Sequence, residues 1–353
     1  MKIRITFLLS LAVTMQFVAA QNPDKKQYRA WWNEQTPGGV YQSANNKKLP
    51  LIQVKGNKFI DEQGKTVLFR GVSISDPDKI ENQGKWNRNL FVKLNEYGVK
   101  LVRIPVHPVA WRERGAQGYL KLLDQAVEWA TEQGIYIIID WHSIGNLKTG
   151  LFQDPMYNTS LSETYDFWRT IARRYSENNT IAFYELFNEP TTYNNQLGHI
   201  SWDEWKGINE QMITIVRAFD KTTIPMVAGF DWAYDLTPLH QSPILAEGIC
   251  YVSHPYPHKR SKPYEPKWEE DFGFAASDYP VVATEIGFTM EDNAVNNEYG
   301  TAILNYLEGR GISWIAWVFD PEWTPSMIES WDTYKLTDCG NFFVNEMKTR
   351  SKK

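Results

Sequence analysis

The sequence predicts an α/β fold, a (β/α)8 barrel preceded by a short N-terminal β-hairpin, and three observations support this prediction. Eight short, continuously apolar runs recur along the chain, and longer segments with helical spacing separate them. This alternation indicates a parallel sheet with helices between its strands. Strands that are apolar on both faces indicate a sheet covered on both sides. The region from residue 67 onward spans about 285 residues, which suits such a barrel with insertions.

The eight predicted strands lie at residues 67–74, 99–106, 135–142, 181–190, 224–230, 248–256, 279–287 and 312–320. Between them, spacings such as Leu90, Phe91 and Leu94 predict helices. No G-x-G-x-x-G fingerprint follows the first strand, so a dinucleotide-binding sheet is the less favoured alternative. Before the barrel, two short strand-like runs flank Gly56 and a further turn falls at Gly64, which predicts the hairpin.

The first 20 residues have the pattern of an export signal. Lys2 and Arg4 precede an apolar stretch, and Val18-Ala19-Ala20 forms a small-residue cleavage site. The apolar core is shorter than the ~20 residues that a spanning helix needs, so a signal is favoured over a membrane anchor. We therefore expect residues 1–20 to be a signal peptide, 21–66 a lead-in with the hairpin, and 67–353 the barrel. Such a signal directs the protein to the periplasm or the medium.

Composition argues against several kinds of partner. The net charge of -5, with both signs interspersed, offers no basic surface for nucleic acid. No later segment could span a bilayer, and we expect a monomer. Cys250 and Cys339 are the only cysteines; export permits a disulfide, but the sequence leaves their pairing open. No cysteine or histidine pair has metal-ligand spacing, so we expect no metal or other cofactor.

Polar side chains stand at the carboxyl ends of six of the eight predicted strands. They are Arg103, Asp140 with His142, Asn188 with Glu189, His254 with Tyr256, Glu285, and Trp317. In a barrel of this kind the functional site is built at those ends. Each residue alone is more often a solvated or ion-paired group, but their joint occurrence at one end predicts a single polar site.

Two of these residues indicate a chemistry. Glu189 and Glu285 follow strands four and seven and are expected to face each other across the barrel mouth. The chain has neither a G-x-S-x-G elbow nor an H-E-x-x-H helix. Paired carboxylates suit cleavage of a glycosidic bond, in which one protonates the leaving oxygen and the other attacks the anomeric carbon or activates water. Retention predicts carboxyl groups about 5 to 5.5 Å apart, against about 6.5 to 9.5 Å for inversion.

A family resemblance rests on these positions. The chain resembles the retaining glycoside hydrolases built on (β/α)8 barrels, most closely family 5, the cellulase family A group, over essentially the whole mature chain. The matching positions are Arg103, His142, Asn188, Glu189, His254, Tyr256, Glu285 and Trp317. The resemblance implies that Glu189 is the general acid/base, that Glu285 is the nucleophile and that Trp317 lies at the cleavage subsite. Trp232 and Trp323 are possible subsite aromatics.

The local chemistry suggests how the two glutamates differ. Arg103 and the hydroxyl of Tyr256 are expected to lower the pKa of Glu285 and hold it ionised. Glu189, expected to be the more desolvated and to lie near a second negative charge, should have a raised pKa and keep its proton. The amide of Asn188 can hydrogen-bond the sugar 2-hydroxyl, a contact that strengthens in the transition state.

Glu185 is a further carboxylate in the fourth strand. It precedes Glu189 by four residues, so it should point to the same side but roughly 13 Å deeper, at about 3.3 Å per residue. We expect it to be a buried structural charge paired with Arg70 on the first strand. His107, which follows the second strand, is expected to edge the cleft.

The substrate is predicted less narrowly than the chemistry. The D-W-H-S motif at residues 140–143 resembles that of family members acting on β-1,4-glucans, which favours an endo-β-1,4-glucanase. The loop at residues 319–331 is longer than is typical of such cellulases and could narrow the cleft. A β-mannanase, another β-glucan or xyloglucan hydrolase, a transglycosylase, an exo-acting enzyme or a non-catalytic carbohydrate-binding protein stay open. The expected partner is a polysaccharide or an oligosaccharide.

Overall fold

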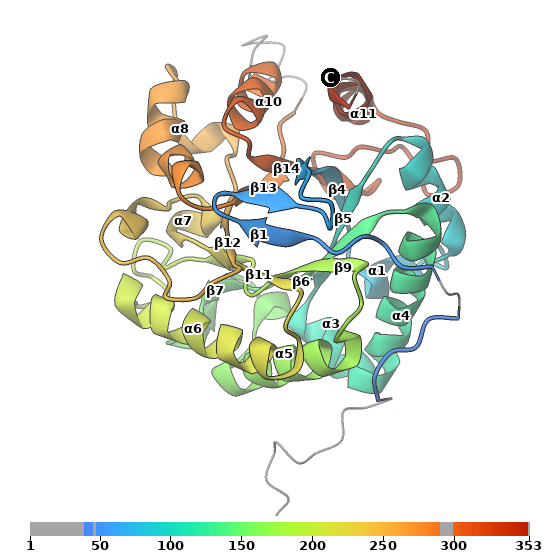
Figure 1. Ribbon diagram of the computed structural model, residues 1–353, viewed down its shortest axis with the longest axis horizontal. Helices are drawn as coiled ribbons and strands as arrows, with labels where there is room; N and C mark the ends of the chain where they lie inside the picture. The colour runs from blue at the N-terminus through green and yellow to red at the C-terminus, as the bar shows by residue number, and fades with distance from the viewer. Residues whose placement is uncertain (1–38, 45–46, 290–298, 352–353) are drawn as a thin grey trace, which may run out of the picture. The chain divides into compact units, whose positions relative to one another are not determined.

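Eight parallel strands close into a barrel at the centre of the structure (Figure 1). The computed structural model describes residues 39–44, 47–289 and 299–351, all within one compact unit, Thr36–Lys353. The strand order around the barrel is β11-β12-β13-β14-β4-β5-β6-β9, and every neighbouring pair is parallel. The predicted (β/α)8 fold is therefore confirmed. The predicted signal peptide lies outside the described residues.

Each barrel strand falls within one of the predicted apolar runs. They are β4 (Arg70–Ile74), β5 (Leu101–Val106), β6 (Tyr136–Trp141), β9 (Ile181–Glu185), β11 (Ile224–Ala228), β12 (Cys250–Ser253), β13 (Val281–Ile286) and β14 (Ser313–Phe319). The fourth run is divided, because β9 stops at Glu185 and a separate strand, β10 (Glu189–Pro190), follows. β10 joins a small outer sheet with β7 (Ile144–Asn146) and β8 (Leu151–Phe152).

Helices surround the barrel, with α4, α5 and α6 along one side of the view in Figure 1 and α8, α10 and α11 along the other. The α-helices are α1 (Pro77–Asn82), α2 (Arg88–Glu96), α3 (Pro108–Arg114), α4 (Ala116–Gln133), α5 (Leu161–Tyr175), α6 (Trp202–Phe219), α7 (Phe230–Ala233), α8 (Glu265–Asp271), α10 (Tyr299–Gly309) and α11 (Asp338–Arg350). The 3-10 helices are η2 (Pro155–Tyr157), η3 (Thr237–His240), η4 (Pro257–Lys259) and η5 (Gly273–Ser277). Within the described ranges, no helix is long and apolar enough to cross a membrane.

Local sequence explains where the longer helices begin and end. Ser201 and Glu204 form a capping box at the start of α6, in which each side chain accepts from the other's backbone N–H. Ser160 caps α5 through the backbone N–H of Glu163. Gly134 ends α4 in the left-handed region at φ 70°, a conformation that costs glycine little.

A small antiparallel sheet packs at the amino-terminal end of the barrel. It contains β1 (Gln53–Lys55), β2 (Lys58–Ile60) and β3 (Thr66–Val67), so the predicted hairpin is confirmed and a third strand extends it. Phe59 places its ring 5.1 Å from that of Phe183 and 6.2 Å from that of Phe69. These rings belong to a buried apolar cluster that fills this end of the barrel. The carboxyl end of the strands is therefore the end at which polar side chains can gather.

Candidate active site

The two predicted glutamates meet at the carboxyl end of the barrel. Glu285 lies near the end of β13, and Glu189 lies on β10. One oxygen of each, together with a ring nitrogen of His254, lies within 4.8 Å of the others. β10 pairs with β7, and the backbone N–H of Glu189 donates to the carbonyl of Ser143 at 3.1 Å, which fixes the position of the Glu189 backbone. Both carboxylates are buried, with 9% of Glu189 and 4% of Glu285 exposed.

Arg103 on β5 connects most of the acidic side chains below the mouth. Its Nη1 donates to Oε1 of Glu285 at 2.8 Å, and its Nη2 donates to Oδ1 of Asn188 at 2.6 Å. Its Nε and Nη2 both donate to Glu185, at 2.7 and 3.1 Å, and Nη2 lies 2.9 Å from Oδ2 of Asp140. The guanidinium is fully buried. A planar donor fork of this kind holds several acceptors in fixed directions.

The predicted pairing of Glu185 with Arg70 is wrong. Arg70, at the amino-terminal start of β4, instead forms two hydrogen bonds with Glu308 on the surrounding helix α10, at 2.7 and 2.9 Å. Glu185 is a buried, paired charge as expected, but its partner is Arg103. It is also closer to the site than predicted, because the ring of His254 approaches Glu185 at 3.7 Å on one edge and Glu189 at 2.9 Å on the other.

The structure does not give the predicted lowering of the pKa of Glu285. The hydroxyl of Tyr256 donates to Oε2 of Glu285 at 2.7 Å, as predicted. Burial nevertheless raises the pKa of Glu285 above its ordinary value, although the charges of His254 and Arg103 and the Tyr256 hydrogen bond act in the opposite direction. The prediction of a net lowering was therefore wrong. Glu189 is the more exposed of the pair, so the expectation that it would be the more desolvated was also wrong.

Two buried groups beneath the glutamates carry charge at neutral pH. Burial disfavours ionisation of Glu185, but the charges of Arg103 and His254 and the two hydrogen bonds from Arg103 hold the pKa of Glu185 at about 2. Burial likewise disfavours a charged imidazole, but the negative charge of Glu285, the hydrogen bond with Glu189 and the nearby carboxylate of Glu185 raise the pKa of His254 to about 9. The Glu185 carboxylate and the His254 imidazolium therefore lie side by side beneath Glu189 and Glu285.

Aromatic rings line the mouth next to the third strand. His142 Nδ1 lies 2.6 Å from Oδ2 of Asp140, and the His142 ring is almost parallel to that of Trp317, with centroids 5.7 Å apart. Trp323 lies against Trp317 at 5.8 Å, and its loop follows β14. His107 lies 4.7 Å from His142 and 5.6 Å from Trp323, measured between ring centroids. Five further predicted site residues thus join Trp317 around the two glutamates and Arg103: His142, Asn188, His254, Tyr256 and Trp323.

Trp232 stands apart from this group. Its Nε1 donates to Gln153 at 2.7 Å, and the ammonium of Lys259 lies 4.7 Å from the centre of its ring. Its backbone adopts a left-handed conformation at φ 55°, and so do both neighbours, Asp231 and Ala233, which is a strained arrangement for residues other than glycine. Across the described part of the chain, no ring contact joins Trp232 to the other predicted site residues.

Thr284 is a buried polar residue that the sequence did not single out. Its hydroxyl donates to Oε1 of Glu185 at 2.9 Å and lies 2.9 Å from Nε2 of His254. Successive residues of a regular strand point to opposite faces, so Thr284 and Glu285 should not share one side. The pairing register of β13 with β14 shifts between Ala283 and Ile286, and this irregularity lets both side chains reach the site. No signal in the sequence marks that shift.

Glu189, His254 and Glu285 are the one group of three in the described residues with ligand-type atoms this close together. Both ring nitrogens of His254 are engaged, Nδ1 with Glu189 and Nε2 with Thr284, so its imidazole offers no free lone pair to a cation. The arrangement is therefore a hydrogen-bonded cluster. By contrast, Nδ2 of Asn188 is buried with no hydrogen-bond partner within the described ranges and remains available as a donor to a ligand.

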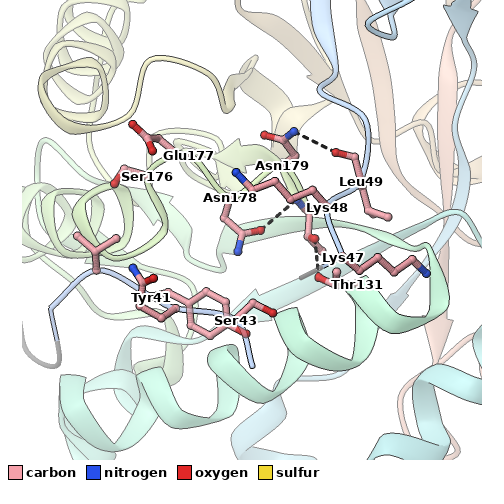
Figure 2. Close-up of a pocket in the computed structure, with 13 residues that line it drawn as sticks. Tyr41, Ser43, Lys47, Lys48, Leu49, Thr131, Ser176, Glu177, Asn178 and Asn179 are labelled. Atoms are coloured by element: carbon pink, nitrogen blue, oxygen red, sulfur yellow. Dashed lines mark hydrogen bonds between the residues drawn. The ribbon is translucent and has the colours of Figure 1, made fainter. Parts of the chain in front are cut away.

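A hollow of about 300 Å³ lies at the opposite end of the barrel from this cluster (Figure 2). It is lined by the N-terminal lead-in, by Thr131 near the end of α4 and by the turn at residues 176–180 that precedes β9. There the side chain of Asn179 donates to the backbone carbonyl of Leu49 at 3.0 Å. None of the predicted site residues lines this hollow, so it is separate from the cluster at the carboxyl ends.

A closed parallel barrel whose mouth holds two carboxylates this close together defines an enzyme of the glycoside hydrolase class. Comparison with known proteins agrees with this class. The family model described as cellulase (glycosyl hydrolase family 5) matches residues 60–322, and the chain belongs to that family.

Known structures and curated proteins include close and distant relatives. The crystal structure of a β-glucanase from Saccharophagus degradans is 46% identical, with a TM-score of 0.86, and the match covers 92% of this chain and all of that one. The same enzyme has been crystallised with cellotetraose. Endoglucanase E-5 of Thermobifida fusca is 25% identical, over 77% of this chain and 56% of that protein. Endoglucanase A of Butyrivibrio fibrisolvens is 27% identical, over 60% and 47%. The chain thus spans about half the length of these curated relatives.

Proposed function

We propose that the protein is an exported, retaining endo-β-1,4-glucanase in which Glu189 is the general acid/base and Glu285 the nucleophile. The observation that carries the proposal is the approach of the two carboxylates, since one oxygen of Glu189 and one of Glu285 lie within 4.8 Å of each other. Retaining enzymes hold their carboxyl groups about 5 to 5.5 Å apart, because the nucleophile must touch the anomeric carbon, whereas inverting enzymes leave about 6.5 to 9.5 Å for a water. Export is proposed from the signal-like residues 1–20.

The first step forms a covalent intermediate. A carboxylate oxygen of Glu285 attacks the anomeric carbon, and the bond from that carbon to the glycosidic oxygen breaks. Glu189 transfers its proton to this oxygen, so the leaving chain departs as an alcohol. Arg103 and Tyr256, which each donate one hydrogen bond to Glu285, favour the ionised form that the attack requires.

The second step releases the sugar. Glu189, now a carboxylate, takes a proton from a water molecule, and the water oxygen bonds to the anomeric carbon as the bond to Glu285 breaks. Two displacements restore the original anomeric configuration. The free Nδ2 of Asn188 would donate to the sugar 2-hydroxyl in both transition states, because its Oδ1 is already held by Arg103.

The substrate class follows from the relatives and from the aromatic wall. The relatives named above are a β-glucanase and two endoglucanases, and the first binds cellotetraose. In this chain, Trp317 and Trp323 present neighbouring ring faces beside the site, which suits pyranose rings of a glucan chain. Trp232, which contacts Gln153 and Lys259 and lies apart from the other site residues, would contact sugar units further along the glucan.

A polysaccharide panel tests the proposal. Purified mature protein is incubated with soluble β-1,4-glucan, mixed-linkage glucan, xyloglucan and mannan, and new reducing ends and product lengths are measured. Glu285→Ala should be inactive, whereas Glu96→Ala, which changes an exposed carboxylate on α2, should behave as the wild type. Internal cleavage of β-1,4-glucan supports the proposal. Cleavage of mannan alone would overturn the substrate, and the absence of cleavage of any glycan would overturn the activity.

A further inference from the structure

The hydrogen bonds of His254 determine which of its ring nitrogens can change protonation. Thr284 has one hydroxyl hydrogen, and that hydrogen is donated to Oε1 of Glu185 at 2.9 Å. Glu185 is ionised, since Arg103 forms two hydrogen bonds with it, and an ionised carboxylate can only accept. The Thr284 oxygen must therefore act as acceptor toward Nε2 of His254, also at 2.9 Å, so Nε2 carries a hydrogen.

With Nε2 protonated, Nδ1 is the nitrogen that can gain or lose a proton, and it faces Glu189. Nδ1 lies 2.9 Å from Oε1 of Glu189 and 3.9 Å from Oε2 of Glu285. A neutral imidazole with hydrogen on Nε2 can only accept at Nδ1, so it requires a protonated Glu189. A protonated imidazole donates at Nδ1 and requires the carboxylate form. A single proton therefore completes the hydrogen bond between Nδ1 of His254 and Glu189, whether it is carried by the nitrogen or by the carboxyl group.

We propose that Glu189 and His254 share the catalytic proton, and that Thr284 and Glu185 are positioning residues that fix His254 with its permanent hydrogen on Nε2. The transfer is a simple exchange in which the N–H bond at Nδ1 breaks as the O–H bond on Glu189 forms, or the reverse. The inference rests on the proposed role of Glu189 as acid/base, and it adds a proton store directly behind that residue.

The surroundings of His254 favour the charged form of the ring. The titratable and charged groups that face it or act on it from the neighbouring strands are Glu185, Glu189, Glu285, Arg103, Asp140 and His142. Burial alone would lower the pKa of His254, but the negative charge of Glu285 and the contacts with Glu185 and Glu189 raise it to about 9. The shared proton is therefore held until the solution becomes clearly alkaline.

This arrangement predicts the pH profile. The alkaline limb of kcat/KM should fall near pH 9, where the pair loses its proton, and not near the pKa of an ordinary glutamic acid. Removing the negative charge of Glu185 makes the imidazolium less favourable, so Glu185→Gln should move this limb toward lower pH by about 1 to 3 units, the usual effect of one nearby charge. Thr284→Val, which removes the acceptor for Nε2, should shift it in the same direction, and Thr284→Ser should restore it.

The test combines two measurements on the full-length mature protein. In the first, 15N-histidine labelling and long-range 1H–15N spectra report the tautomer of His254, identified by the signal lost in His254→Gln. We expect hydrogen on Nε2 at every pH and a titration at Nδ1 near pH 9. A neutral ring with its hydrogen on Nδ1 would overturn the proposal. Because this measurement uses no substrate, it is independent of whether the proposed hydrolase activity is correct.

The second measurement is the pH profile of kcat/KM for the variants. Thr131→Val is the matched control, because Thr131 is a buried hydroxyl that bonds Thr180 and Val127 away from the site. Thr284→Val, a nearly isosteric change, serves if Glu185→Gln fails to fold. A shifted alkaline limb in Thr284→Val, with Thr284→Ser and Thr131→Val unchanged, supports the proposal. Equal loss of activity at all pH values, with no movement of the limb, would contradict it.

Discussion

Arg103 is the residue whose loss should damage the protein most at neutral pH. Its guanidinium is fully buried and contacts the carboxylates of Glu285, Glu185 and Asp140. Arg103→Met keeps much of the side-chain volume but leaves these carboxylates buried without their shared cation. Removing one partner of a buried ion pair is strongly destabilising, because the remaining charge is no longer compensated.

The pKa of Glu185 gives the size and the pH dependence of this effect. It is held at about 2 in the folded protein, against about 4.3 in an unstructured chain, which corresponds to about 3 kcal/mol. Because this pKa is lowered by folding, the stabilisation is complete above about pH 4.3 and is lost as the pH falls through about 2. We expect Arg103→Met to lose about 3 to 5 kcal/mol at pH 7, or roughly 6 to 10 °C in Tm at about 2 °C per kcal/mol.

Thermal unfolding at pH 7, 5 and 3 measures both features. Arg70→Met is the matched control, because Arg70 pairs with Glu308 in a partly exposed position and should cost about 1 kcal/mol or less. The difference in Tm between the wild type and Arg103→Met should narrow as the pH is lowered, whereas that of Arg70→Met should change little. The reasoning is refuted if both variants lose the same stability at pH 7, or if the Arg103→Met difference is constant down to pH 3.

Four further outcomes are expected. Glu189→Gln should lower turnover of a natural glycan by about 10² to 10⁴ but affect an aryl glycoside with an activated leaving group much less; equal losses would exclude it as the acid. Tyr256→Phe should lower kcat/KM by about 10 to 100-fold, the worth of one hydrogen bond to a charged group, with an unchanged fold by circular dichroism. Asn188→Ala should lower kcat/KM for a glucoside more than for its 2-deoxy analogue; an equal loss would argue against a contact with the 2-hydroxyl. Cys250 and Cys339 are free and buried, so both thiols should react with a thiol reagent only after unfolding, and a reductant should leave Tm unchanged.

The barrel could be predicted because its strands leave a strong pattern. Runs such as residues 135–142 are apolar on both faces, since one face meets the barrel interior and the other meets helices. Arg103, Glu189 and Glu285 could also be placed, because the carboxyl ends of parallel strands lie at one end of a barrel whatever the loop details. Both the barrel and the position of these three residues could therefore be predicted from features that all barrels of this fold have.

The partners inside the barrel could not be predicted in the same way. The predicted partner of Glu185 was Arg70 on the first strand, but Arg70 pairs with Glu308 on helix α10, and the long side chain of Arg103 reaches Glu185 instead. Thr284 enters the site only because the register of β13 shifts, which leaves no trace in the residue pattern. The pKa of Glu285 depends on how deeply it is buried, which only the packed structure defines.

Trapping the covalent intermediate is the most direct test of the proposed mechanism. A 2-deoxy-2-fluoro cellobioside with an activated leaving group slows both displacements, so a glycosyl-enzyme with a nucleophilic carboxylate should accumulate. Mass spectrometry of the digested protein should find one sugar per chain, attached to the peptide that contains Glu285, and no label on Glu285→Ala. A label on any other residue, or no label together with a product of inverted configuration, would contradict the assignment of Glu285 as the nucleophile of a retaining enzyme.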